Sequence, residues 1–361
     1  MNRFSNFGGN LADRESVRGL LLGSAAVSAM VLGMAPMGEA TAAADDVVAT
    51  IDLDYSANDV EISPDGSRAY ATDGIQGSLI VIDTPTDTVV DTVPVGENPN
   101  GVTVTPDGTR VYVANSGSEG QQAVEGSVSV IDTATDTVVE TIDAGVHPYQ
   151  VAVAPDGAFV YVTNDWYDLY ADVGTGALTV IDTATNAVTD TVPIGNSAKG
   201  LAVTPDGSGV FVADFTDDSV KLIDSVTHDV DATIAVEKPW RVAAVPGTTA
   251  PDISAYVTSV ADNTVSVVSY FGLGVTIPVG EQPWGVDVSP DGKYAYVANN
   301  DGSSLTEIET STNTVRGTVP LDGHVWDVSV APDGSFAYVA GHGLFRVSLF
   351  PFADLPQSPQ T

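Results

Sequence analysis

The chain has 361 residues, with 12 Lys and Arg against 48 Asp and Glu, which gives a formal net charge of −36, and it contains no cysteine. A phosphate backbone or an anionic lipid surface requires a basic footprint, so this charge argues against nucleic acid or an acidic membrane as the partner. The lack of cysteine excludes disulfides, thiolate metal sites, thioether-linked haem and cysteine nucleophiles.

Residues 1–42 have the order of a secretory signal peptide. Three arginines within the first 19 residues precede an apolar run from Leu20 to Leu32, and small residues suited to cleavage follow at 40–44. An uncleaved membrane anchor is the alternative, but the run is short and contains Gly23. The sequence therefore predicts cleavage near residue 42 and a secreted or cell-envelope protein, with no membrane span after cleavage.

Residues 45–350 consist of seven copies of one unit. The tripeptide Pro-Asp-Gly begins at Pro64, Pro106, Pro155, Pro205, Pro290 and Pro332. The double-length interval holds a degenerate copy at Val245-Pro246-Gly247, which makes the spacings between successive prolines 41 to 50 residues. A period of this length with four short strands per unit is typical of the blades of a β-propeller.

Each unit predicts four strands. In the second unit Gly101–Thr105 alternates apolar and polar residues, a Pro-Asp-Gly turn follows, and further strands are predicted at Val111–Asn115, Ser127–Ile131 and Thr137–Ile142. No helical periodicity separates the strands, so the crossovers that a parallel sheet needs are missing. The fold class is therefore all-β, a seven-bladed β-propeller with four antiparallel strands per blade.

The two ends of the array complement each other. The last unit has only three strands, which end at Leu344–Leu349, whereas an extra strand at Val47–Ile51 precedes the first unit and has the composition of a fourth strand. We expect this N-terminal strand to complete the seventh blade, because ring closure removes the open edges of a linear array. Residues 351–361 then form a C-terminal tail.

A tyrosine-containing motif marks the second strand of several units. It reads Val-Tyr-Val-Ala-Asn at Val111–Asn115, Val-Tyr-Val-Thr-Asn at Val160–Asn164 and Tyr-Val-Ala-Asn at Tyr296–Asn299. With the Pro-Asp-Gly turns, these motifs resemble those of the YVTN-type β-propeller repeat family. The resemblance implies a seven-bladed propeller similar to YncE-like and surface-layer-type proteins, most of which are non-catalytic envelope proteins. Lactonases and quinoprotein amine dehydrogenase subunits have related folds, but their activity motifs are not found in this sequence.

The chain lacks the local motifs of common enzyme and metal sites. Its four histidines show no paired metal-ligand spacing, and it has no P-loop, G-x-G-x-x-G motif or nucleophile elbow. The aspartates of the Pro-Asp-Gly turns are expected to cap their own turns. Acid clusters such as Asp214, Asp217 and Asp218 lack EF-hand spacing, which leaves weak calcium binding or a solvated acidic surface open. We predict no catalytic residue, no cofactor and no specific metal site.

One position of the repeat holds three of the four tryptophans of the chain. It lies six residues before the proline that ends each first strand, and we call its residues the ring position. They are Asn58, Asn100, Tyr149, Lys199, Trp240, Trp284 and Trp326. First strands line the channel of a propeller, so these side chains should surround its upper mouth. The indoles either form a binding surface or plug the channel, and both interpretations are open.

Basic residues gather at the same position. Lys199 belongs to the ring position and Arg241 follows it, whereas the acids Asp59 and Asp327 stand elsewhere in the repeat order. We therefore expect an anion to collect beside Lys199 and Arg241. Three more basic residues lie near in sequence: Lys238, His147 and His324.

Two long connections, residues 115–126 and 164–176, should open on the same upper face, because they link second to third strands. The second would bring Trp166 to the mouth.

The leading interpretation is an exported, monomeric, non-catalytic module that binds a small molecule, a glycan or a protein at the upper mouth. The candidate ligand-binding residues are Tyr149, Lys199, Trp240, Arg241, Trp284, Trp326, His147, His324 and Trp166. Two alternatives are a surface-layer-type structural component and a lactonase- or lyase-like enzyme. The enzyme would use His147, Lys199, Arg241 and His324.

Overall fold

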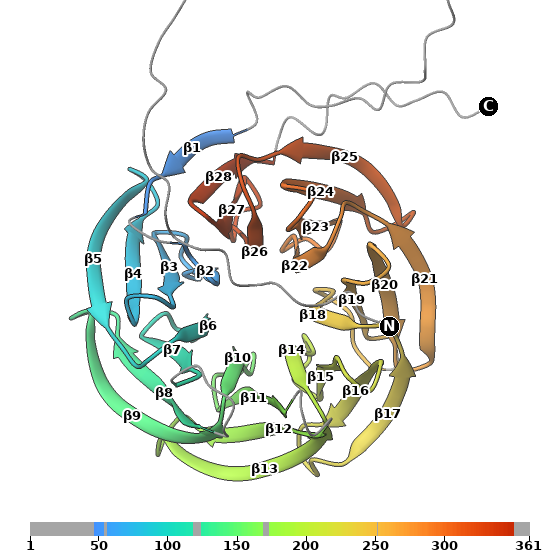
Figure 1. The fold of residues 1–361 in the computed structure, drawn as a ribbon, viewed down its shortest axis with the longest axis horizontal. Helices are drawn as coiled ribbons and strands as arrows, with labels where there is room; N and C mark the ends of the chain where they lie inside the picture. Colours follow the sequence, from blue (N-terminus) through green and yellow to red (C-terminus); the bar gives the residue numbers. More distant parts are fainter. Residues whose placement is uncertain (1–46, 54–55, 118–123, 169–172, 251, 350–361) are drawn as a thin grey trace, which may run out of the picture. The chain divides into compact units, whose positions relative to one another are not determined.

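The computed structural model describes residues 47–53, 56–117, 124–168, 173–250 and 252–349. These residues form seven four-stranded antiparallel sheets arranged as the blades of a ring around a central channel, as predicted (Figure 1). The predicted signal peptide and the predicted C-terminal tail lie outside the described residues. No helix that could cross a membrane occurs in the part of the chain that the structure describes.

In each blade the first strand lines the channel and the fourth strand lies outermost. Blade 1 has β2 (Val60–Ile62), β3 (Arg68–Asp73), β4 (Ser78–Asp83) and β5 (Thr88–Pro94). Blade 2 has β6 (Pro99–Val104), β7 (Arg110–Asn115), β8 (Glu125–Asp132) and β9 (Thr137–Val146). Blade 3 has β10 (Pro148–Val153), β11 (Phe159–Asp168), β12 (Val173–Asp182) and β13 (Ala187–Gly195). Blade 4 has β14 (Ala198–Val203), β15 (Gly209–Asp214), β16 (Ser219–Asp224) and β17 (Val230–Ala235).

The remaining three blades follow the same order. Blade 5 has β18 (Pro239–Ala244), β19 (Ser254–Ser259), β20 (Thr264–Ser269) and β21 (Gly272–Pro278). Blade 6 has β22 (Pro283–Val288), β23 (Tyr294–Asn299), β24 (Ser304–Glu309) and β25 (Thr314–Pro320). Blade 7 has β26 (Val325–Val330), β27 (Phe336–Gly341), β28 (Leu344–Ser348) and β1 (Val47–Ile51).

The N-terminal strand closes the ring, as predicted. β1 is the outer strand of blade 7 and pairs antiparallel with β28, with Ile51 opposite Leu344 and Thr50 opposite Phe345. The blade that ends the chain is therefore completed by the strand that begins the propeller.

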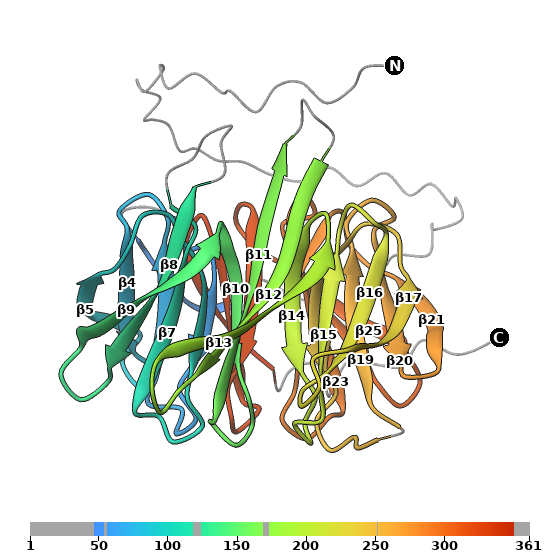
Figure 2. The ribbon, with the colours of Figure 1, turned by 90° about the horizontal axis from the view of Figure 1, so that it is seen from below.

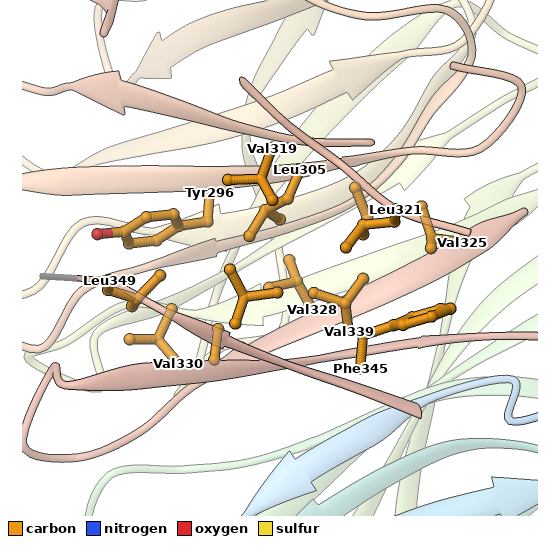
Figure 3. Packing of buried hydrophobic residues seen from close by; sticks show 13 residues of the cluster. Tyr296, Leu305, Val319, Leu321, Val325, Val328, Val330, Val339, Phe345 and Leu349 are labelled. Carbon is orange, nitrogen blue, oxygen red and sulfur yellow. The ribbon is translucent and has the colours of Figure 1, made fainter. Parts of the chain in front are cut away.

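The hydrophobic core lies between neighbouring blades. Each core cluster joins apolar side chains of two adjacent blades, and Figure 3 shows the cluster in which Tyr296 and Leu305 of blade 6 face Val339 and Phe345 of blade 7. The second and third strands of the blades are almost fully buried, whereas the outer strands expose most of their residues. This pattern explains why the inner strands read as nearly continuous apolar runs.

The Pro-Asp-Gly turns lie at the lower end of the blades, opposite the end at which the β11–β12 hairpin projects (Figure 2). The Asp65 carboxylate accepts hydrogen bonds from the Ser63 hydroxyl at 2.7 Å and the Ser67 amide at 3.0 Å, and these bonds lower the pKa of Asp65. Gly66 of the same turn has φ 71°, a conformation that favours glycine. The capping role expected for this aspartate is confirmed.

Blade 6 contains a buried glutamate, Glu307 of β24. No other blade has an acidic residue at the equivalent position of its third strand. Tyrosines of the second strands reach the turn of the next blade, as in the 2.6 Å bond from the Tyr256 hydroxyl to the Asn313 side chain. Blade 7 has no turn between its two outer strands, because β1 comes from the other end of the chain. The Tyr296 hydroxyl instead pairs within its own blade with Glu307, which also accepts a 3.1 Å bond from Arg316.

Glu307 should make stability depend on pH. Burial raises the pKa of Glu307 from 4.5 to about 7, so the folded protein holds this proton more tightly than the unfolded chain. The stability gained from the protonated carboxyl is therefore complete below pH 4.5 and is lost as the pH rises through 7. A shift of this size corresponds to about 3 kcal/mol at most. We expect E307Q to flatten the fall of the urea midpoint between pH 5 and pH 8. E309Q, two residues away on the same strand, is the control and should keep the parent slope.

Candidate binding site at the upper mouth of the channel

The residues of the ring position meet around one cavity at the upper end of the channel. The cavity has a volume of about 100 Å³ and is called the aromatic cavity below. It is lined by Asn58, Asn100, Tyr149, Trp240, Trp284 and Trp326 of the ring position and by Asp59, Gln150 and Arg241 of the next position. Lys199, the seventh ring residue, adjoins the cavity because its ammonium lies 4.6 Å from the Tyr149 ring centre and 4.7 Å from that of Trp240.

The three ring indoles are half-buried; Trp240 and Trp284 contact each other, and Trp326 meets His342 edge-on at 5.1 Å. The rings of Trp240 and Trp284 have centroids 4.8 Å apart with an interplanar angle of 34°, and Tyr149 meets Trp240 edge-on at 6.2 Å. Phe215 also meets Trp240 edge-on, at 5.5 Å, and was not expected at the mouth because it lies outside the first strands. The aromatic rings therefore form much of the lining of the aromatic cavity.

Arg241 is not available to an anion, which corrects the expectation from the repeat order. Its Nη2 lies 2.9 Å from Asp59 Oδ1 and 2.9 Å from Asp327 Oδ2, and its Nε donates to Asp327 Oδ1 at 3.1 Å. The expectation was wrong because the long side chain spans the channel from blade 5 to blades 7 and 1. Distance along the repeat order does not measure distance across a ring.

The two acids that bind Arg241 occupy the position after the ring position in blades 7 and 1. In the other blades this position alternates between a residue with a long side chain and glycine, and the alternation breaks at these two acids. The position after the ring position carries Asp59, Gln150 and Arg241 in blades 1, 3 and 5, and glycine in blades 2, 4 and 6. A Cβ on Gly285 would lie 2.6 Å from the Cα of Asp327, so a side chain there would clash with the next blade. Seven blades cannot alternate throughout, so both Asp327 of blade 7 and Asp59 of blade 1 carry a side chain.

The seam between blades 7 and 1 therefore holds a carboxyl pair. Asp59 and Asp327 are 3% and 5% exposed, and burial, opposed by Arg241 and reinforced by the Asp59 charge and hydrogen bond, raises the pKa of Asp327 well above its usual range. Asp59 also accepts the Val60 amide at 2.9 Å and the Val102 amide of blade 2 at 3.1 Å. With Arg241 of blade 5, this cluster joins four blades at the mouth.

Below Arg241 the channel widens into a cavity of about 300 Å³ that is lined by further acids. Burial raises the pKa of Asp287 to about 6, and its carboxylate accepts the Val288 amide at 2.7 Å and the Val330 amide at 2.8 Å. Burial also raises the pKa of Glu61 well above its usual range. The interior of the channel thus disfavours anions.

Lys199 is likewise engaged. Its ammonium pairs with Asp165, and the Lys199 side chain is only 14% exposed. Burial alone would lower the pKa of Lys199, but the Asp165 charge and hydrogen bond, together with Tyr149, raise it by more, so the pKa rises. Lys199 is therefore a fixed cation that packs on Tyr149 and Trp240.

All nine Lys and Arg residues beyond residue 42 form ion pairs. The pairs are Arg68–Asp136, Arg110–Asp132, Lys199–Asp165, Lys221–Asp214, Lys238–Asp218, Arg241 with Asp59 and Asp327, Lys293–Asp291, Arg316–Glu307 and Arg346–Asp87. Nine bases pair with ten acids, so most acids in the part of the chain that the structure describes have no Lys or Arg of their own.

Salt should consequently stabilise the propeller. The 48 acids and 12 bases of the chain leave a large excess of like charge, whose repulsion falls when salt screens it. Screening also weakens exposed ion pairs, but each contributes only about 0–1 kcal/mol. We expect the melting temperature to rise between dilute buffer and about 1 M NaCl, where the Debye length is about 3 Å. A flat or falling melting temperature would contradict this.

The histidines of the predicted set lie apart from the aromatic cavity. His147, with φ 45°, lines a second cavity of about 650 Å³ that shares Asn58, Asn100 and Tyr149 with the first. His324 is exposed, and its Nδ1 lies 3.2 Å from the Asn300 carbonyl oxygen. The structure does not bring both histidines together with Lys199 and Arg241 around one cavity.

The connection expected at residues 164–176 is largely strand, which corrects that expectation. β11 and β12 stay paired from Asn164 opposite Ala177 to Asp168 opposite Val173. Aromatic and β-branched residues favour strand, which explains the extension. The Trp166 backbone pairs with Thr175 in this hairpin, and the Trp166 side chain lies outside what the structure describes. Of the connection 115–126, residues 118–123 are outside the described residues.

The described residues contain no group of three His, Asp or Glu residues that could hold a metal ion. The acids singled out as a possible calcium site have other partners. Asp214 pairs with Lys221 at 2.8 Å, Asp218 pairs with Lys238 at 2.7 Å, and Asp217 accepts the Asn196 side-chain amide at 2.6 Å.

Comparison with known proteins supports the architecture. A family model described as Choice-of-anchor I domain matches residues 31–140, which is 110 of the 361 residues. None of the curated proteins matches the sequence. Among solved structures, Kuenenia stuttgartiensis hydrazine synthase is similar, with a TM-score of 0.69 and 21% identity, over 83% of this chain and 97% of that chain. At this identity the similarity concerns the fold alone, and with the seven observed blades it identifies the chain as a β-propeller repeat protein.

Proposed function

We propose that the protein is an exported, non-catalytic binding module of the cell surface that takes its ligand at the upper mouth of the channel. The Choice-of-anchor I match supports attachment to the cell surface. Residues 1–42 supply the export signal, 45–350 the propeller and 351–361 a tail. The Val-Tyr-Val-x-Asn motifs favour a YVTN-type propeller, similar to YncE-like or surface-layer-type proteins, that acts as a monomer.

The aromatic cavity is the observation that carries the proposal. Three half-buried indoles and one phenol line a concave opening at the channel mouth, and such pockets are typical ligand sites. A scaffold without a ligand would gain from closing these apolar faces onto one another. The enzyme alternative receives no support from the geometry, because His147 and His324 do not face the same cavity as Arg241.

Tryptophan accessibility tests the proposal. In a W166F background, only the three ring indoles fluoresce, and acrylamide should quench them to an intermediate extent because they are half-buried. We expect W284A to reduce the free energy of unfolding by about 1–2 kcal/mol, through the lost stacking on Trp240. Indoles closed into a plug would resist quenching, and W284A would then cost about 3–5 kcal/mol as a buried aromatic truncation.

Export has its own test. The full chain, produced in a bacterial host, should be recovered outside the cytoplasm with an N-terminus near residue 43. Recovery of an unprocessed chain from the cytoplasm would contradict export without bearing on the mouth.

A further inference from the structure

We propose that the ligand is a neutral oligosaccharide, with one sugar ring in the aromatic cavity and further sugars along the polar cavity beside it. This inference rests on the proposed function of the mouth. It follows from a contrast between two kinds of polar group at the mouth. The charged groups already form ion pairs, whereas most of the neutral polar groups have no hydrogen-bond partner among the described residues.

The charged groups of the mouth are paired with one another. Arg241 donates to both carboxylate oxygens of Asp327 and pairs with Asp59, whose oxygens also accept two backbone amides. Lys199 pairs with Asp165, which also accepts a 2.6 Å bond from the Ser197 hydroxyl. A charged ligand would have to separate a buried ion pair and leave its partner uncompensated, which is strongly unfavourable. The site therefore favours an uncharged ligand.

The neutral polar groups of the same cavity are not paired. Among the described residues, no hydrogen-bond partner exists for the indole N–H groups of Trp240, Trp284 and Trp326, the Tyr149 hydroxyl or the Gln150 side-chain amide. They comprise three N–H donors, one hydroxyl and one amide, all on residues that line the aromatic cavity. A wholly apolar ligand would desolvate them without replacing their hydrogen bonds, at about 1–3 kcal/mol for each group.

The remaining surface of the cavity is aromatic. Trp240 and Trp284 lie against each other, the Tyr149 ring meets Trp240 edge-on, and all three line the cavity together with Trp326. A sugar ring combines an apolar C–H face, which packs on an aromatic ring, with a rim of hydroxyls that both donate and accept hydrogen bonds. This combination matches a cavity that is lined by aromatic rings and by unpaired N–H, O–H and amide groups.

The second cavity extends the site beyond one sugar. It has a volume of about 650 Å³, shares Asn58, Asn100 and Tyr149 with the aromatic cavity, and is otherwise lined mainly by small or neutral polar side chains. These include Ser56, Asn98 and Ser116. The Asn58 amide donates to the Pro99 carbonyl at 3.0 Å, and the Asn100 amide donates to the Ser116 hydroxyl at 2.5 Å. The local bonds fix both side chains while their amide oxygens accept no bond from a described residue.

The test is titration of the purified full-length protein with a panel of hexasaccharides, followed by indole fluorescence and calorimetry. The neutral probes are cellohexaose, maltohexaose, mannohexaose and chitohexaose, the charged probe is hexagalacturonate, and the apolar aromatic probe is phenol. We expect at least one neutral hexasaccharide to bind at least tenfold more tightly than its own monosaccharide and than hexagalacturonate. Its affinity should change less than twofold between 0.05 and 0.5 M NaCl.

Variants of the unpaired groups sharpen the test. Y149F and Q150A should each weaken hexasaccharide binding about 5- to 20-fold while the unfolding midpoint stays close to the parent. N100A should weaken the hexasaccharide more than the monosaccharide, because Asn100 borders both cavities. F271A is the control, since Phe271 is an aromatic residue that is 74% exposed and lies outside both cavities.

The outcomes separate the two proposals. Tighter binding of hexagalacturonate, or binding of phenol alone, would overturn the neutral-sugar inference and keep the mouth as a binding site. The same inference is overturned if no neutral hexasaccharide binds. The proposed binding function fails as well if, in addition, the ring indoles resist acrylamide quenching and W284A lowers the free energy of unfolding by the amount expected for a buried aromatic residue.

Discussion

A chain that begins at residue 54 should be less stable than one that begins at residue 43 by about 5 kcal/mol, because it lacks the strand that closes the ring. β1 provides the outer strand of blade 7, and its removal exposes the edge of β28. It also removes Ile51, which is 7% exposed, and Val47, which packs on the core between blades 6 and 7. Urea unfolding followed by circular dichroism measures the difference.

Two point variants separate ring closure from a general effect of shortening the chain. I51A truncates a core residue and should cost about 2–5 kcal/mol. V48A changes a side chain on the outward face of the same strand, 59% exposed, and should change stability by less than about 0.5 kcal/mol. If the chain starting at residue 54 unfolds at the parent urea concentration, β1 does not close the ring.

The fold could be predicted because its determinants are local and repeated. The Pro-Asp-Gly turn occurs in six of the seven units and the alternation of the strands recurs along the array, so each unit supports the interpretation of the next. Even the degenerate copy at Val245-Pro246-Gly247 was placed correctly, between β18 and β19. The pairing of β1 with β28 followed from one missing strand and one extra strand.

Part of the site could be predicted for the same reason. A position counted back from the repeated proline is at the same height in each blade, so the ring residues meet at the mouth. The partners of Arg241 could not be found in this way. They depend on the diameter of the closed ring and on side chains that cross it, and neither is encoded in spacing along the chain. Phe215 and Glu307 were missed because each occurs in one blade and breaks the repeat.

The β11–β12 extension shows a further limit of the repeat pattern. A longer connection predicts a loop, but strand pairing continues wherever both sides can adopt extended backbone and face each other in register. The repeat specifies where a blade begins, whereas the length of its hairpin depends on the residues of that hairpin alone.

R241M should be among the most destabilising single substitutions at the mouth, with a loss of about 3–5 kcal/mol near pH 8. Without Arg241, Asp59 and Asp327, which are 3% and 5% exposed, lose the only cation that pairs with them among the described residues. Burial already raises the pKa of Asp327, and loss of the guanidinium charge raises it further. The folded variant therefore holds a proton that the unfolded chain releases, so its stability deficit should shrink as the pH falls from 8 to 5.

The triple variant D59N/R241M/D327N distinguishes this electrostatic account from simple loss of packing. It removes the charges of both acids together with the cation, and a neutral cluster of similar volume should recover stability to within about 1–2 kcal/mol of the parent, with little dependence on pH. If R241M loses the same amount at pH 5 and pH 8, and the triple variant recovers nothing, Arg241 stabilises the mouth by packing alone. Recovery in the triple variant would instead show that Arg241 stabilises the mouth by compensating the charge of the two carboxyl groups. The odd number of blades brings these carboxyl groups together at the seam, and blade 5 supplies the arginine that faces them across the channel.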